Sequence, residues 1–68
     1  MYGIITVVYE GQLDAGLFSY LDERKARVRR GASLVIECRD VDEVLSGLLG
    51  YLSAGKAQVS KIHLRRAA

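Results

Sequence analysis

Apolar and polar residues follow two different periods along this chain. Residues 4–9, 33–38 and 58–64 are rich in β-branched side chains and have the length and alternation of strands. Residues 14–30 and 40–54, between them, carry apolar side chains at helical spacing. The order strand, helix, strand, helix, strand predicts an α/β fold. We expect a single domain over residues 1–68, with a three-stranded, mostly parallel sheet and two covering helices.

The distribution of apolar side chains predicts the order of the strands. In residues 4–9 both alternating sets are apolar, which is typical of a central strand. The other two strand segments have one apolar set each, as half-buried strands do. An order 2-1-3, with the first strand in the middle, follows from this pattern. An order 1-2-3 with both helices on one face also fits.

Both helix patterns carry start and stop signals. Asp14 and Asp40 are candidate N-caps, and Glu43 lies three residues after Asp40, as in a capping box. Gly31 and Gly55 follow the helices, where a left-handed residue commonly ends a helix.

Residues 25–39 also fit a hairpin that turns at Gly31 and Ala32, because arginines alternate with small or apolar residues over positions 26–30. The helix is favoured instead by the good helix formers over residues 22–30 and by the i, i+4 pair of Glu23 and Arg27.

The length and the cysteine content limit the class of protein. A chain of 68 residues buries a small core and gains stability from association, so we expect a homo-oligomer. The single cysteine, Cys38, lies in an apolar run and cannot form an internal disulfide, which favours a reducing, cytoplasmic compartment. No signal peptide and no membrane-length apolar segment is present in the sequence, so we expect no membrane association.

Basic residues are concentrated in two segments, 22–30 and 61–66. The candidate partner-binding residues are Arg24, Arg27, Arg29, Arg30, Lys61, His63 and Arg65. A solvated helix end with cations at its C-terminus also accounts for the first segment. A net charge of +2 and the lack of interleaved aromatic residues weaken the case for nucleic acid, and a protein with an acidic surface fits equally well.

The sequence contains no recognisable catalytic spacing. Four acidic residues surround the start of the second helix: Glu37, Asp40, Asp42 and Glu43. Capping of the helix is favoured over a Mg²⁺ site, because a metal would need several of these carboxylates to converge. His63, Ser46 and Ser60 lack the partners of a nucleophilic site. We therefore expect no enzymatic activity, no cofactor and no metal.

Three glycines lie inside helix patterns, where each costs about 1 kcal/mol relative to alanine. They are Gly16, Gly47 and Gly50. The small residues of the second helix define a hypothetical oligomer face: Ser46, Gly47, Gly50 and Ala54. A poorly optimised exposed helix would give the same pattern.

Three short segments are similar to motifs of one known family. Residues 11–15 (GQLDA) match a G-x-L-D-A turn into a helix, residues 34–42 (LVIECRDVD) match a motif strand, and residues 46–48 (SGL) match the start of the following helix. Over residues 4–64 the chain thus resembles a STAS domain, the α/β module of anti-sigma-factor antagonists and of some transporter tails. The resemblance implies protein binding.

The chain also departs from the STAS pattern. The motif has an acidic residue followed by a phosphorylatable serine, and this chain has Val44, Leu45 and Ser46 there instead. The chain is one residue shorter than the motif at this point, so that Ser46 aligns with the second serine of the motif. The leading strand and the final strand-helix unit of the family are missing. No phosphorylation switch is therefore expected.

Two functions are compatible with these observations. The first is a small non-enzymatic regulatory or inhibitory protein, STAS-like or similar to small phage inhibitors, that docks on another protein. The second is a nucleic-acid-binding module that uses the basic end of the first helix and the third strand. Binding that depends on phosphates weakens steeply with salt, which separates the two.

Overall fold

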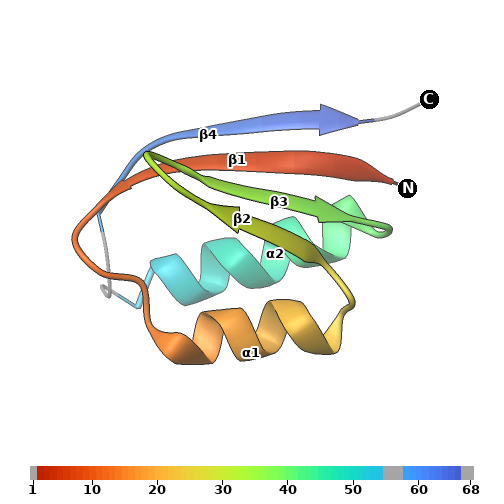
Figure 1. Cartoon of the computed structure of the whole chain (residues 1–68), viewed down its shortest axis with the longest axis horizontal. Coiled ribbons are helices and arrows are strands. Elements are labelled where there is room, and N and C mark those ends of the chain that lie inside the picture. Colours follow the sequence, from red (N-terminus) through yellow and green to blue (C-terminus); the bar gives the residue numbers. More distant parts are fainter. Residues whose placement is uncertain (1, 55–57, 67–68) are drawn as a thin grey trace.

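The computed structural model describes residues 2–54 and 58–66, which form one sheet and two helices. In chain order the elements are β1 (Gly3–Glu10), α1 (Ala15–Glu23), β2 (Arg27–Arg30), β3 (Leu34–Cys38), α2 (Val41–Leu52) and β4 (Gln58–Arg66). The strand order is β2-β3-β1-β4, and every neighbouring pair is antiparallel (Figure 1). The predicted three-stranded, mostly parallel sheet is therefore wrong. The central position of the first strand, between β3 and β4, is confirmed.

The error originates at the end of the first helix. Helix α1 stops at Glu23, and Lys25 has a φ of 56°, in the left-handed region. The Ala26 N–H donates to the Leu21 carbonyl at 3.0 Å, and the Lys25 N–H donates to the Asp22 carbonyl at 2.9 Å. These two bonds form a Schellman motif, which ends the helix well before the predicted stop at Gly31.

The residues after this motif form a hairpin, which is the alternative that the sequence also fits over residues 25–39. Residues 27–30 pair antiparallel with residues 34–37, and the turn includes a hydrogen bond from the Gly31 N–H to the Ser33 carbonyl at 3.1 Å. The extra strand β2 reverses the direction of β3 relative to β1. In the resulting βαββαβ arrangement β1 and β2 are parallel with β3 between them, which is the ferredoxin-like, or split βαβ, topology.

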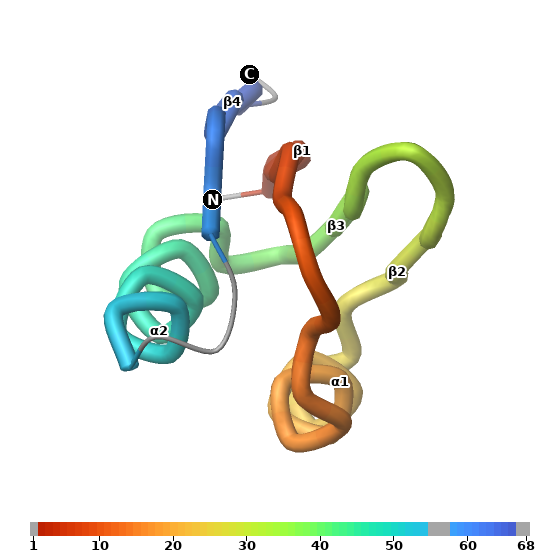
Figure 2. Tube along the Cα trace, turned by 90° about the vertical axis from the view of Figure 1, so that its left-hand side faces the viewer, coloured from red at the N-terminus to blue at the C-terminus, as the bar shows by residue number. Residues whose placement is uncertain are grey.

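Both helices lie on the same face of the sheet (Figures 1 and 2). The core lies between them and that face, and alternate residues of β1 and β3 point into it. The buried apolar residues are Ile5, Val7, Leu13, Leu17, Leu21, Leu34, Ile36, Cys38, Val41, Val44, Leu48 and Leu52. No helix in the described part of the chain is long and apolar enough to cross a membrane.

The predicted N-caps are confirmed. The Asp14 carboxylate accepts a hydrogen bond from the Gly16 N–H at 2.8 Å, and the Asp40 carboxylate accepts one from the Glu43 N–H at 3.2 Å. Helix α2 ends at Leu52, slightly before the predicted end at Ala54. The predicted stop at Gly55 lies outside the described residues.

The two helices contact each other through reciprocal pairs of tyrosine and glycine. A Cβ atom added to Gly47 would overlap the Tyr20 hydroxyl, and one added to Gly16 would lie 2.8 Å from the Tyr51 hydroxyl oxygen. Each helix thus provides a glycine where the other helix places a tyrosine. Burial raises the pKa of Tyr51 above its ordinary value of 10.0, and a hydrogen bond to the Asp14 carboxylate raises it further.

Candidate functional site

The face of the sheet that points away from the helices carries a group of basic side chains. Because side chains alternate along a strand, the residues next to the buried ones in β1 and β3 point to this side, and their cross-strand partners do the same. We call this surface the open face. It consists of Ile4, Thr6, Val8, Arg27, Arg29, Val35, Glu37, Lys61, His63 and Arg65. No helix of the described residues covers it (Figure 2).

The strand register aligns these side chains in rows across the sheet. One row is Arg27, Glu37, Ile4 and Arg65, and the next row is Arg29, Val35, Thr6 and His63. Lys61 lies opposite Val8 in a third row. Each of the first two rows has a basic side chain on both outer strands, β2 and β4. Since neighbouring strands are about 4.8 Å apart, the two basic edges are about 14 Å apart.

The middle of the open face is aliphatic and slightly hollowed. Ile4, Thr6, Val8 and Val35 are half-buried there, although nothing in the described residues packs over them. A shallow hollow of about 440 Å³ is lined by Ile4, Thr6, His63, Leu64 and Arg65. Another, of about 330 Å³, is lined by Arg29, Arg30, Gly31, Ala32, Ser33 and Val35. Both hollows therefore include arginine, which suits an anionic group.

Positive charge is concentrated on the open face of the sheet. The open face has four formal positive charges, on Arg27, Arg29, Lys61 and Arg65, and one negative charge, on Glu37. Six of the eight acidic residues lie in the helices or at their caps: Asp14, Asp22, Glu23, Asp40, Asp42 and Glu43. The net charge of +2 is thus the sum of +3 on the open face and −1 on the rest of the chain, where Arg24, Arg30 and Arg66 lie among these carboxylates.

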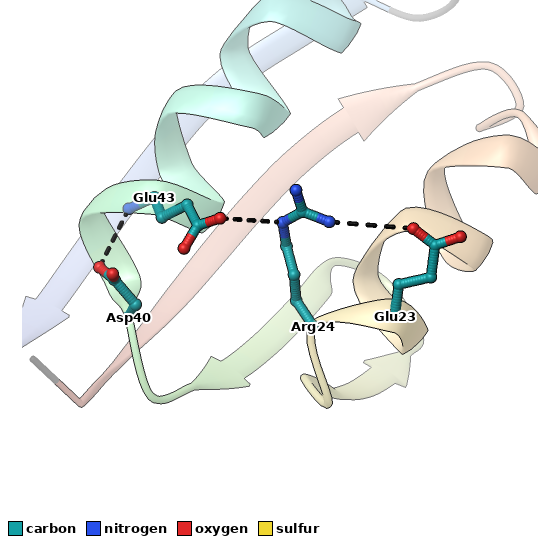
Figure 3. Close-up of polar contacts among 4 residues, drawn as sticks. All are labelled: Glu23, Arg24, Asp40 and Glu43. Atoms are coloured by element: carbon teal, nitrogen blue, oxygen red, sulfur yellow. Dashed lines mark hydrogen bonds and ion pairs between the residues drawn. The ribbon is translucent and has the colours of Figure 1, made fainter.

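Two of the predicted partner-binding residues do not belong to the open face. The Arg24 guanidinium stacks on the Tyr20 ring at 3.9 Å, and its Nε atom lies 3.4 Å from the Glu43 carboxylate (Figure 3). Arg30 points to the helix side, where its guanidinium lies 4.5 Å from the centre of the Phe18 ring. Both arginines make contacts within the chain and hold α1 against its neighbours.

The other five predicted residues come together. Arg27, Arg29, Lys61, His63 and Arg65 are all exposed and share the open face. The first two lie in β2, however, and not on the polar face of a helix as predicted. If residues 26–30 are assigned to a strand, their alternation predicts that Arg27 and Arg29 share a face.

The acidic residues near the start of α2 act within the fold. Asp40 caps the helix, Asp42 forms an ion pair with Arg66, and Glu43 pairs with Arg24. Glu37 lies on the other side of the sheet, next to Arg27. Among the described residues no group of three His, Cys, Asp or Glu side chains is placed to hold a metal ion.

The hypothetical oligomer face on α2 is divided by the structure. Gly47 faces Tyr20 of the same chain, whereas a Cβ atom at Gly50 would meet nothing within 4 Å. Ser46, Gly50 and Ala54 are exposed, next to Leu49, which is 48% exposed. Self-association through this surface stays a prediction.

Cys38 is buried, as its place in an apolar run predicts. Burial raises the pKa of its thiol above the ordinary 9.0, and the nearby Asp40 carboxylate raises it further. The thiol is therefore protonated at neutral pH and poorly suited to act as a nucleophile.

Comparison with protein-family models, with curated proteins and with solved structures finds no match to this chain. The resemblance to STAS domains is therefore untested.

Proposed function

We propose that this protein is a nucleic-acid-binding module that uses the open face of its sheet. The observation that carries this proposal is the placement of exposed basic residues on both outer strands, with one carboxylate among ten side chains. Neutralisation of phosphates by lysine and arginine is the main source of affinity for nucleic acids.

The concentration of positive charge on one face offsets the small net charge of the chain. A net charge of +2 is small for such a protein, but a nucleic acid that approaches the open face meets mainly the basic side chains. The carboxylates on the helix side are behind the sheet, and the core separates them from the ligand. Fields of this kind guide a charged ligand to one side of a protein.

The chemistry of the open face suits binding without a reaction. Arginine donates paired hydrogen bonds to phosphate oxygens, and lysine contributes a point charge. These side chains lie on paired strands, so their spacing is set by the sheet. We therefore assign this face to recognition, without a catalytic step.

Charge reversal on the open face tests this proposal. Arg27→Glu with Arg29→Glu should weaken binding of a fluorescently labelled DNA oligonucleotide roughly tenfold or more in low salt, because two phosphate contacts become repulsive. Fluorescence anisotropy measures the affinity, and circular dichroism checks that the fold is intact. The matched control is Arg30→Glu with Arg66→Glu, which changes the charge equally on the helix side. Unchanged affinity in the first variant, or no binding by the wild type, would contradict the proposal.

A second candidate function is docking on another protein through the outer side of α2. Leu49 is 48% exposed there, beside Ser46 and Gly50, and such a side chain is able to anchor a protein interface. Binding through this surface should depend weakly on salt, and Leu49→Ser should reduce it without affecting the open face.

A further inference from the structure

We infer that the open face binds double-stranded DNA, with the phosphates of one strand along β2 and those of the other along β4. This inference rests on the proposed function and adds the class of nucleic acid. It follows from three features of the open face: the separation of its basic edges, the nature of its middle, and the position of its one carboxylate.

The separation of the basic edges fits a groove of a duplex. Arg27 and Arg29 lie on one outer strand, and Lys61 and Arg65 lie on the other, about 14 Å away by strand spacing. The major groove of B-DNA is about 12 Å wide, with a phosphate backbone on each side. Long, exposed arginine and lysine side chains on the two edges can therefore each reach one backbone.

The middle of the open face does not suit the bases of a single strand. Proteins that bind single strands stack bases on aromatic rings, which contributes about 1–3 kcal/mol per base. None of the ten open-face positions is Phe, Tyr or Trp. Phe18, Tyr20 and Tyr51 lie on the helices, and Tyr9 packs against the core. Tyr2, which is 44% exposed, lies two residues before Ile4, outside the strands and beyond the middle of this face. The methyl groups of Ile4, Val8 and Val35 offer apolar contact without stacking.

Glu37 lies between the two basic edges, in the row that joins Arg27 to Arg65. A single strand that ran along the middle of the sheet would bring its phosphates close to this carboxylate, which is unfavourable. Phosphates at the β4 edge are two strands away from it, and those at the β2 edge approach it only beside Arg27.

The salt dependence of binding tests this two-edged contact. We would titrate the wild-type protein against a short labelled DNA duplex and against each of its separated strands, and measure affinity over a range of salt. Four phosphate contacts predict a slope of log K against log[salt] of about −3.6 for the duplex, since each contact contributes about −0.9. The duplex should bind more tightly than either strand.

Variants of each edge show whether both take part. Arg27→Gln with Arg29→Gln, and separately Lys61→Gln with Arg65→Gln, should each reduce the steepness of the duplex slope by about 1.8. The control, Arg30→Gln with Arg66→Gln, removes the same charge from the helix side and should leave the slope unchanged.

The outcomes separate this inference from the proposed function. Tighter binding to a single strand, or a slope that responds to one edge alone, would overturn the duplex inference and leave nucleic-acid binding intact. Absence of binding to both forms of DNA in low salt would overturn both.

Discussion

Lys25 decides where the first helix ends, and therefore whether β2 forms. It occupies the C′ position of the Schellman motif with a φ of 56°, a conformation that glycine adopts without strain and that costs other residues about 1–2 kcal/mol. The sequence predicted both N-caps, because Asp14 and Asp40 are standard capping residues. It did not predict this C-terminus, because a lysine carries no signal for the left-handed conformation.

Replacing Lys25 with glycine should therefore stabilise the protein. We expect Lys25→Gly to raise the free energy of unfolding by about 0.5–1 kcal/mol, because the strain at this position is relieved. Lys25→Ala is the matched control, since it removes the same charge and keeps the strain, and it should give no gain. Chemical denaturation followed by circular dichroism measures both. Equal stability of the glycine and alanine variants would show that the strain at Lys25 is negligible.

At the scale of elements, the contact between the two helices explains two of the three unusual glycines. Gly47 accommodates Tyr20, and Gly16 accommodates Tyr51, so each glycine permits a close approach within the chain. The spacing glycine, three residues, tyrosine occurs in both helices, at residues 16–20 and 47–51. This repetition is a signal in the sequence, but its meaning depends on the antiparallel approach of α1 and α2, which periodicity alone does not show.

Alanine at Gly47 and at Gly50 should have opposite effects on stability. Gly50→Ala should stabilise α2 by up to about 1 kcal/mol, because its added methyl group meets open space and alanine is the better helix former. Gly47→Ala should destabilise by about 1–2 kcal/mol, because its methyl group overlaps Tyr20 and crowds the core.

Thermal unfolding measures this pair, since 1 kcal/mol shifts the melting temperature of a domain this size by about 4–8 °C. Adding Tyr20→Phe to Gly47→Ala should recover part of the loss, because the overlapping hydroxyl is removed. A stabilising effect of Gly47→Ala alone would show that Tyr20 moves aside at little cost.

The elements themselves were predictable to different degrees. Segments with one clear period, β1, β3, α2 and β4, were recognised, and the central place of β1 followed from its two apolar faces. Residues 24–30 fit the period of a helix and that of a strand, and their helix propensity favoured the helix, which is wrong. The direction of every later strand depends on that short segment, so one local error changed a four-stranded antiparallel sheet into a three-stranded parallel one.

For the whole molecule, the second apolar face of β1 lies on the uncovered side of the sheet, which the sequence did not predict. A strand with two apolar faces predicts a sheet covered on both sides, yet helices cover one side of this sheet. Ile4, Thr6 and Val8 form the middle of the open face instead. The basic residues were identified from the sequence. Their assembly into one face depends on strand register and on the hairpin, which are tertiary properties.

The central claim, that the open face is the binding surface, is tested most directly by nuclear magnetic resonance. A ¹⁵N-labelled sample of the wild-type protein would be titrated with the short DNA duplex, and the amide shifts would be followed residue by residue. We expect the largest changes in β2 and β4, around Arg29 and His63, with smaller changes in β1 and β3 and little change along the outer side of α2. Shifts concentrated around Leu49 and Gly50 on α2, with β2 and β4 unaffected, would contradict it.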